Sequence, residues 1–429
     1  MRDNSIGIGQ AWEILFERHR IAQKVREDGL FRISAAEINT VKEARLMAKF
    51  DQSQRLPEVF RQNQLSILPV TRGEYVIGPF ETHARVEYTA VPVKQVRVPE
   101  LETLDAANLY SEASALSFAF NSGIFEDAME AGRLFYTVNG RMASGEFSFR
   151  IKDAKRPGGR QELFVSNAQV EIDGGYEGEN AFIICEAKNI AAEELLIRQL
   201  YYPYRLWKGK VKKPVVPVFM VYSNDIFHIF VYEFTEMCDY NSLHMLAHKA
   251  YTCADETIAR ADLEAVFRDV GAPGKEPEAV FPQADSFARV VDLLSVLYER
   301  SLTRDEVTLQ YEFDERQTNY YISACEYLGL IVRESNEERE RVYALSEDAR
   351  ALMGLRYKEK YLGLVKRILS CPVFYHAFFL ALFSGEVPEK AAVVRIMKEE
   401  KLPLSESTMV RRASTVRGWL MWIFELEAK

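Results

Sequence analysis

The chain has 429 residues, of which 48% are hydrophobic and 12% aromatic, so it is long and apolar enough to form two to four packed domains. Its apolar runs fall far short of the roughly 20 residues that cross a bilayer, and its first ten residues lack the apolar core of a signal peptide, so we expect a cytoplasmic protein without a membrane segment. Five scattered cysteines do not suggest a disulfide framework, and a net charge of −9 means that any contact with nucleic acid must depend on local clusters of Lys and Arg.

Residues 1–95 are predicted to form an α+β module. Apolar periodicity, with Ser34 and Ser53 at capping positions, predicts helices over 11–27, 34–45 and 53–64, a strand over 30–33, and two strands around Arg72-Gly73 between 65 and 81. This order is winged-helix-like in outline. Basic residues of the module are candidates for DNA contact, with ordinary surface charge as the alternative interpretation: Arg45, Lys49, Arg55, Arg61 and Arg72.

Residues 96–270 are predicted to form the central domain. We expect a long helix over 103–130, which carries Glu112, strands over 134–138 and 145–151, a hairpin with arms at 164–177 and 181–188, a helix over 191–209 that carries Leu195, Leu196 and Gln199, and two apolar strands around a turn at 223–225.

The hairpin places charged side chains where burial is expected. Side chains two positions apart on a strand share a face, so Glu171 and Asp173 point one way on the first arm, and Glu186 and Lys188 point one way on the second. Burying a lysine beside several acids is costly unless these groups pair or hold a cation. The hairpin therefore predicts a functional site.

The spacing of these residues resembles a known signature. Asp173, twelve residues, and then Glu186-Ala187-Lys188 after an apolar run resembles the motif of PD-(D/E)XK nucleases, although Ile172 stands where that motif has a proline. The predicted order of strand, strand with Glu-x-Lys, helix and strand is similar to the core of restriction-endonuclease-like folds. Segments 43–81 and 407–423 also resemble parts of bacterial type II restriction endonucleases.

The resemblance implies an α/β fold in which helices flank a mixed sheet, and Mg²⁺-dependent, sequence-specific cleavage of double-stranded DNA. By the same resemblance, Asp173, Glu186 and the carbonyl of Ala187 would hold the metal and Lys188 would orient the attacking water. Further residues are secondary candidates for the site: Gln199, Glu171 and Glu112. A homodimer is expected because two strands are cut, and a cognate DNA methyltransferase would be the genetic partner.

Two other interpretations stay open. In the first, the protein is a non-catalytic, winged-helix DNA-binding regulator whose hairpin acids form a structural salt-bridge cluster. In the second, it is a nuclease for modified or structured DNA, which would carry the same motif.

A positively charged segment follows the predicted helix that carries Gln199. Residues 198–213 contain six basic residues and no acid, interleaved with tyrosines and Trp207. This pattern favours contact with a DNA backbone, and a solvated turn between helix and strand is the alternative. The candidates, called the basic run below, are Arg205, Lys208, Lys210, Lys212 and Lys213.

Beyond a Pro- and Gly-bearing linker at 271–284, two further domains are predicted. Residues 285–352 have the helix, helix, helix, strand, turn, strand order of a winged helix-turn-helix, and 353–429 are helical with a second helix-turn-helix-like segment that Ser405 caps. Trp419, Leu420 and Ile423 are expected on its core face. Because the wing is partly acidic, the first of these domains could instead pack against a partner. Candidate DNA-contacting residues are Arg316, Gln317, Asn319, Arg411, Arg412 and Arg417.

Two other constellations are set aside. Cys238, His244, His248 and Cys253 follow a spacing that is not a recognised zinc arrangement, and a packed helix is the preferred interpretation. The chain contains no G-x-x-x-x-G-K-[ST] motif, so no ATP requirement is expected.

Overall fold

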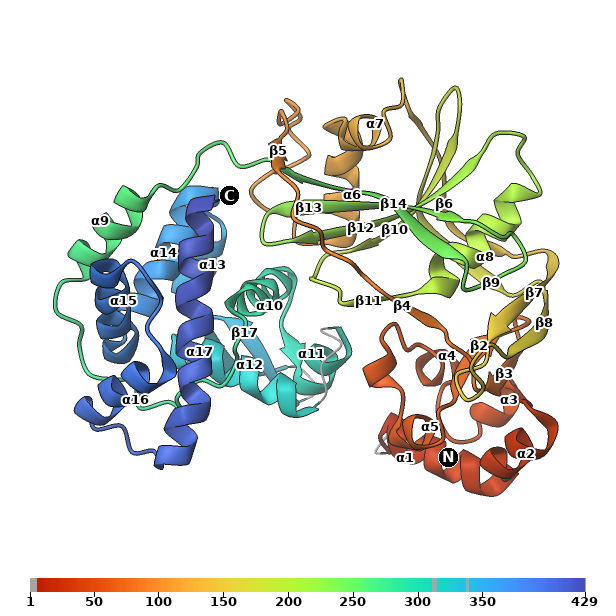
Figure 1. Ribbon diagram of the computed structural model, residues 1–429, viewed down its shortest axis with the longest axis horizontal. Helices are drawn as coiled ribbons and strands as arrows, with labels where there is room; N and C mark the ends of the chain where they lie inside the picture. The colour runs from red at the N-terminus through yellow and green to blue at the C-terminus, as the bar shows by residue number, and fades with distance from the viewer. Residues whose placement is uncertain (1–5, 311–314, 337–338, 429) are drawn as a thin grey trace.

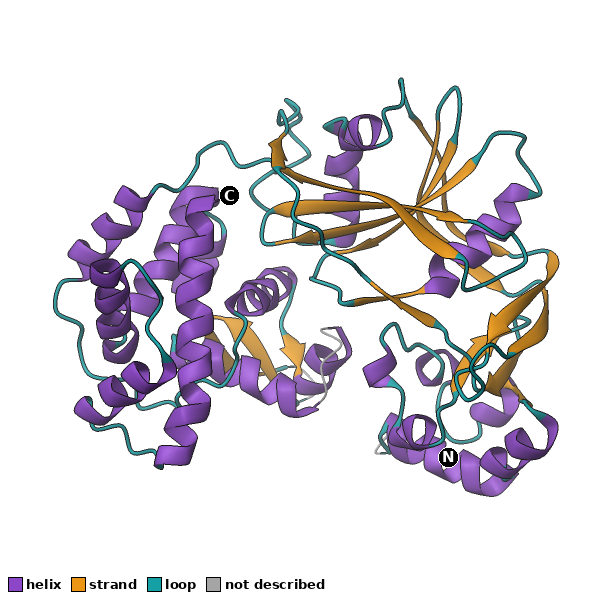
Figure 2. Cartoon of the chain, in the orientation of Figure 1, coloured by secondary structure: helices purple, strands orange, loops and turns teal. Residues whose placement is uncertain are grey.

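A computed structural model of the protein describes residues 6–310, 315–336 and 339–428. A mixed seven-stranded sheet lies at the upper right of the view, with an amino-terminal module of short helices below it and a mainly helical carboxy-terminal body to the left (Figures 1 and 2). Among the described residues, no single helix is long and apolar enough to cross a membrane.

The amino-terminal module combines short helices with a small antiparallel sheet of order β1-β3-β2. Its elements are α1 (Ile8–His19), α2 (Ile21–Asp28), β1 (Phe31–Ser34), α3 (Ala35–Ile38), α4 (Ala44–Met47), the 3-10 turn η1 (Ser53–Arg55), α5 (Glu58–Gln62), β2 (Ser66–Pro69) and β3 (Glu74–Gly78). The predicted cap at Ser34 is confirmed, because its hydroxyl accepts a hydrogen bond from the Glu37 amide at 3.1 Å. The strands around Arg72-Gly73 are confirmed as well.

All three predicted amino-terminal helices are broken. The helix predicted over 34–45 is divided into α3 and α4, with residues 39–43 not helical. The helix predicted over 11–27 is divided at Arg20, which takes a left-handed conformation with φ 52°. The helix predicted over 53–64 is divided into η1 and α5, because Pro57 disfavours the helical conformation for Leu56.

The central sheet has the strand order β5-β14-β13-β12-β10-β9-β6. Its strands are β5 (Val93–Gln95), β6 (Phe135–Ala143), β9 (Gln169–Glu177), β10 (Phe182–Lys188), β12 (Val215–Ser223), β13 (Ile226–Phe234) and β14 (Leu243–Thr252). The predicted hairpin is confirmed as antiparallel β9 and β10, and β10 is parallel to β12. The chain crosses from β10 to β12 through α8 (Ile197–Lys208).

Helices cover both faces of this sheet, as predicted. Helix α8 packs on the face that carries Phe219 and Phe230, while α6 (Glu112–Asn121) and α7 (Ile124–Ala128) pack on the opposite face, with Val218 and Met220. Because β10 is covered on both sides, six of its seven residues are buried, which explains why the sequence there is an unbroken apolar run up to Glu186. The α/β class with a mixed sheet between helices is therefore confirmed.

Three predicted elements of the central domain differ in the structure. The helix predicted over 103–130 begins only at Glu112, after a capping box at Ser111, and is interrupted at Gly123 with φ 78°. Leu195 and Leu196 belong to a short strand, β11 (Glu194–Leu196), which pairs with β4 (His83–Arg85), and not to the following helix. The segment with His244 and His248 is strand β14 and not a helix. A β-bulge lies between the two histidines, which pair with Glu233 and Phe230 on opposite faces of β13.

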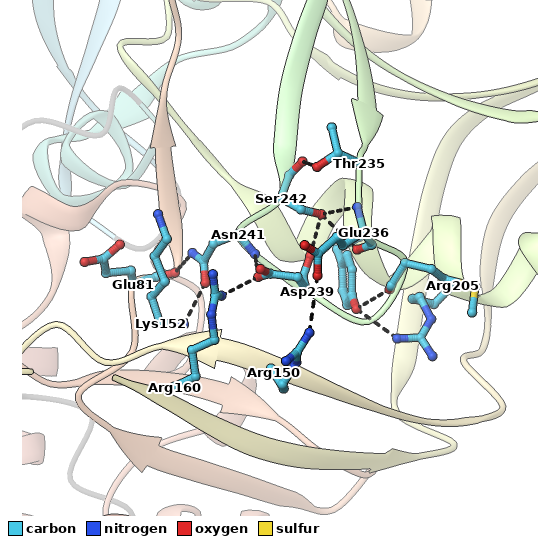
Figure 3. Close-up of polar contacts among 12 residues, drawn as sticks. Glu81, Arg150, Lys152, Arg160, Arg205, Thr235, Glu236, Asp239, Asn241 and Ser242 are labelled. Carbon is cyan, nitrogen blue, oxygen red and sulfur yellow. Dashed lines mark hydrogen bonds and ion pairs between the residues drawn. The ribbon is translucent and has the colours of Figure 1, made fainter. Parts of the chain in front are cut away.

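A separate hairpin, β7 (Glu146–Lys152) with β8 (Arg160–Ser166), extends beside the sheet. Its residues were predicted partly as one long strand with β9, but Asn167 with φ 54° separates β8 from β9. The turn that follows β13 holds the hairpin: Arg160 pairs with Asp239 at 2.7 Å, and the Lys152 amide donates to Asn241 at 2.8 Å (Figure 3).

The carboxy-terminal body shares one hydrophobic core. Its elements are α9 (Arg260–Val270), α10 (Phe287–Glu299), β15 (Leu302–Thr303), α11 (Arg304–Gln310), α12 (Glu315–Tyr327), β16 (Ile331–Ser335), β17 (Arg341–Leu345), α13 (Glu347–Met353), α14 (Tyr357–Leu369), α15 (Pro372–Ser384), α16 (Lys390–Glu399), α17 (Glu406–Glu425) and the 3-10 turn η2 (Leu426–Ala428). The short strand β15 adds to the predicted order and completes a sheet of order β15-β17-β16. Parts of the predicted segment 302–313 and of the turn at 336–340 lie outside the described residues.

Two details of this body were predicted correctly. Ser405 caps α17, and Trp419, Leu420 and Ile423 are fully buried. The segment 271–284 has neither helix nor strand, but it is packed and not a free linker, because Glu276 accepts hydrogen bonds from the Val373 amide and the Tyr327 hydroxyl.

The carboxy-terminal body also holds the segment that follows β10. The Ala191 amide donates to Asp292 at 3.0 Å, and Asp292 accepts from Ser223 at 2.8 Å. Lys360 of α14 pairs with Asp225 in the β12–β13 turn at 2.8 Å. The end of the central sheet and the helical body are therefore joined by buried polar contacts.

Candidate active site

A cleft of about 600 Å³ lies between the amino-terminal module and the central sheet. Its lining includes Asp173, Glu186 and Lys188, and also all of the secondary candidates, Gln199, Glu171 and Glu112. Three candidates for DNA contact line the same cleft from the amino-terminal module; they are called the cleft cations below and are Arg45, Lys49 and Arg72. Residues that are up to about 150 positions apart in the chain therefore meet at one place.

The β9–β10 hairpin positions the first carboxylate. The backbone pairing between β9 and β10 ends at Gly174 opposite Cys185. At the preceding residue of β9, the side-chain carboxylate of Asp173 bonds to the backbone of β10 instead. It accepts a hydrogen bond from the Ala187 amide at 2.9 Å. Since the N–H and C=O of one strand residue leave from the same edge, the Ala187 carbonyl faces the side of Asp173.

The second carboxylate is buried on β10. Glu186 is 6% exposed and accepts hydrogen bonds from Lys188 at 2.9 Å and from Gln199 in the first turn of α8. Burial, reinforced by the neighbouring Asp173, raises the pKa of Glu186 to about 8, although Lys188 opposes the shift. Burial also raises the pKa of Asp173. Two adjacent acids with raised pKa values form a site that a cation would stabilise.

Lys188 lies between acids from two domains. Its ammonium is 2.9 Å from Glu186 and 3.8 Å from Asp51, which follows α4 in the amino-terminal module. Burial alone would lower the pKa of Lys188, but Glu186, Asp51 and Glu112 raise it well above its ordinary value. Lys188 is therefore a charged ammonium held in a fixed place.

Sequence reasoning missed Asp51. Burial opposes its ionisation, but Lys188 and neighbouring cations hold the pKa of Asp51 below its usual value. It is 137 positions from Lys188, and no local motif marks it. The only signal is that Asp51 is the one acid between Glu43 and Glu58, in a stretch that carries three basic residues.

The donor set fits a hard divalent cation. Among the residues that the structure describes, no group of three or more His, Cys, Asp or Glu side chains is arranged to hold a metal. Mg²⁺, however, commonly uses one or two protein carboxylates and keeps several waters or substrate oxygens as its other ligands. Asp173, Glu186 and the Ala187 carbonyl would supply such a set. They interact with one another, since Asp173 and Glu186 perturb each other's pKa.

Two other acids that line the cleft, Glu171 and Glu112, are exposed. Glu171 is exposed and pairs with Arg141 at 3.1 Å. Glu112 begins α6, and although its side chain is exposed, desolvation by the surrounding walls raises its pKa. Both can shape the field in the cleft, and neither contacts Glu186 in the described hydrogen bonds and ion pairs.

Two of the basic residues predicted on the amino-terminal module lie away from this lining. Arg55 donates hydrogen bonds to the carbonyls of Thr308 and Leu309, the second at 2.6 Å, and so ties the module to the last turn of α11. Arg61 is exposed on α5.

The basic run extends from Arg205 on α8 to Lys213 at the far end of the sheet. Lys213 contacts the β9–β10 turn, where it pairs with Glu177 at 2.6 Å and donates to the Gly178 carbonyl at 2.8 Å. From Phe182, beside this turn, β10 extends six residues to Lys188, or about 20 Å at the usual strand rise. The run follows Asp173, Glu186 and Lys188 in sequence, but α8 carries the chain back along β10 to the opposite end.

The candidates in the carboxy-terminal body are also outside the lining of the cleft. Arg316 and Asn319 are exposed on α12, and Gln317 is half-buried on the same helix. On α17, Arg411 is exposed, whereas Arg412 bonds to Gln283 and Arg417 pairs with Glu389 at 2.9 Å; the last two are thus engaged in internal contacts.

Comparison with known proteins gives three family matches, each to a domain of unknown function. Residues 9–77 match DUF6996, residues 78–252 match DUF6997, and residues 289–428 match DUF7226. The first boundary falls at the end of β3 and the second match ends with β14. No curated protein and no solved structure matches the chain.

Proposed function

We propose that the protein is an Mg²⁺-dependent endonuclease that hydrolyses phosphodiester bonds of double-stranded DNA at a specific sequence, as type II restriction endonucleases do. The observation that supports this most strongly is the convergence of Asp173, Glu186 and Lys188 in one cleft, with the cleft cations on the facing wall. Two carboxylates with raised pKa values beside a fixed ammonium suit metal-assisted attack on a phosphate.

Each residue has a role in this proposal. Asp173, Glu186 and the Ala187 carbonyl would hold Mg²⁺, which supplies a water of lowered pKa and neutralises charge on the scissile phosphate. Lys188 orients the attacking water and donates to the phosphate. Gln199 fixes the Glu186 carboxylate from α8. The amino-terminal module provides the cleft cations for the DNA backbone.

The charge of the cleft favours a polyanion once the metal is bound. Its lining carries six basic and six acidic side chains, so its formal charge is zero and becomes +2 with one Mg²⁺. A net charge of −9 for the whole chain therefore does not exclude DNA from this surface.

The finer fold assignments and the partners belong to the same proposal. The central domain would be a restriction-endonuclease-like core, and residues 1–95 and 285–352 would be winged-helix-like. A homodimer in the cytoplasm, with a cognate DNA methyltransferase as genetic partner, would cut both strands.

A DNA-binding regulator is the second candidate. The helices and three-stranded sheet of residues 287–353, with Arg316 and Asn319 exposed on α12, favour it. On this interpretation the acids of the cleft serve stability alone. It gives no role to the placement of Asp173, Glu186 and Lys188 in a cleft that is also lined by the exposed cleft cations.

Incubating a sequenced plasmid with the purified protein and Mg²⁺ tests the proposal. Discrete fragments that recur between preparations are expected, and Asp173→Asn, which keeps an acceptor for the Ala187 amide, should produce none. Plasmid that is retarded in a gel but intact would favour the regulator.

A further inference from the structure

Arg198 has a place in the cleft that the motif does not explain. It lies in the first turn of α8, next to Gln199, and lines the cleft together with Asp173 and Glu186. Its guanidinium is half-buried and makes no hydrogen bond or ion pair within the described parts of the chain. A guanidinium carries five donors in a planar fork, so a half-buried one without a partner is a ready site for an anion.

Arg205, two turns farther along α8, shows the opposite situation. Its guanidinium donates to the Ser148 carbonyl at 2.9 Å and to the Tyr201 hydroxyl at 2.8 Å, and it lies over the Phe147 ring. Arg205 thus connects α8 to the β7–β8 hairpin. The same helix carries one arginine with a structural role and one that lines the cleft.

The positive field around Arg198 is only partly balanced. Arg198 helps to hold the pKa of Asp51 low, but Asp51 also interacts electrostatically with Lys188, its closest cation, and with Lys49. Across the cleft, the cleft cations are exposed and make no ion pair among the described residues. Four cations in one cleft are therefore left without a partner in contact.

We infer that Arg198 and the cleft cations form a second anion site, which takes a backbone phosphate of DNA adjacent to the phosphate that is cut. The identity of the ligand rests on the proposed function. Arg198 lines the cleft from α8, and the cleft cations line it from the amino-terminal module, so the phosphate is held between two domains. A bidentate contact from Arg198 would fix the register of the strand relative to Glu186. Arg198 is thus a substrate-positioning residue and takes no part in metal binding.

Binding measurements in Ca²⁺ test this inference without relying on cleavage. A fluorescent duplex of random sequence is titrated with wild type, Arg198→Gln and the matched control Arg205→Gln at several KCl concentrations, and each variant is melted to verify folding. Arg198→Gln should weaken binding roughly tenfold and reduce the slope of log affinity against log salt by about 1. Arg205→Gln should leave that slope unchanged, and Arg198→Lys should restore it because the charge returns.

The outcomes separate this inference from the proposed function. An unchanged slope for Arg198→Gln in a protein that still cuts DNA would overturn the anion site and leave the nuclease standing. Equal loss in Arg198→Gln and Arg205→Gln would also overturn it, since the effect would then be structural. If wild type never cuts DNA but Arg198→Gln still reduces the slope of log affinity against log salt by about 1, the anion site is supported and the nuclease is rejected.

Discussion

Replacing Lys188 with Met separates a catalytic lysine from a structural one. The change keeps much of the length and the apolar stem but removes an ammonium that is 16% exposed and lies 2.9 Å from Glu186 and 3.8 Å from Asp51. Breaking a buried ion pair by removing one partner costs about 3–5 kcal/mol. The lower end applies here, because Glu186, with a pKa of about 8, can take up a proton at neutral pH, and Asp51 keeps other cations near it.

A loss of about 3 kcal/mol corresponds to a fall in Tm of roughly 6–12 °C for domains of this size. On the catalytic interpretation, cleavage measured well below the Tm should also fall by roughly 10²- to 10³-fold, the usual effect of removing one donor to a developing charge. The stability effect alone would not reduce turnover by the folded protein.

The chain offers a matched control in Lys360. This lysine is 2% exposed and pairs with Asp225 at 2.8 Å, outside the lining of the cleft. Lys360→Met should lower the Tm by a similar amount and leave the rate of plasmid cleavage by the folded protein unchanged. If the two variants cut DNA at the same rate, the assignment of Lys188 to the reaction is wrong.

Three further predictions use other parts of the structure. Asp173→Ala should abolish cleavage in Mg²⁺ but retain duplex binding in Ca²⁺, measured by fluorescence anisotropy; near-normal cleavage would remove Asp173 from the site. Replacing the cleft cations with Gln should weaken binding to specific and random DNA at least as strongly as replacing the lysines of the basic run with Gln. A larger loss of affinity for the basic-run variant would show that DNA binds elsewhere. Burial raises the pKa of Asp292 to about 6 from an ordinary value of 3.8, so the stability that its protonated form provides is fully present below pH 3.8 and is lost as the pH rises through 6. Asp292→Asn should therefore gain roughly 2 kcal/mol relative to wild type between pH 4 and pH 8 in denaturant unfolding, and a constant difference would show that Asp292 does not titrate in this range.

Local patterns predicted the central hairpin well. The alternation in β9, the apolar run of β10 and the turn between them are short-range features, so Asp173, Glu186 and Lys188 could be placed at one point from the sequence. The cap at Ser34 was predicted for the same reason, since the residues that make it are three apart.

Errors arose where one spacing fits two structures or where the chain reverses. His244 and His248 would share a face of a helix or of a regular strand, and pairing with β13, with a bulge between the two, decides for the strand. The basic run follows the motif closely in sequence, yet its last residue, Lys213, lies about 20 Å from Lys188 because α8 carries the chain back along β10. Asp51 could not be predicted, because only the docking of the amino-terminal module on the sheet brings it to Lys188.

The most direct test of the central claim is single-turnover cleavage of a plasmid by wild type and Glu186→Gln, with Mg²⁺, with Ca²⁺ and with a chelator. The substitution preserves the size of a side chain that is 6% exposed but removes the charge that would hold the metal. We expect cleavage only by wild type and only with Mg²⁺. Cleavage by Glu186→Gln at the wild-type rate, or cleavage by wild type in the chelator, would contradict the account.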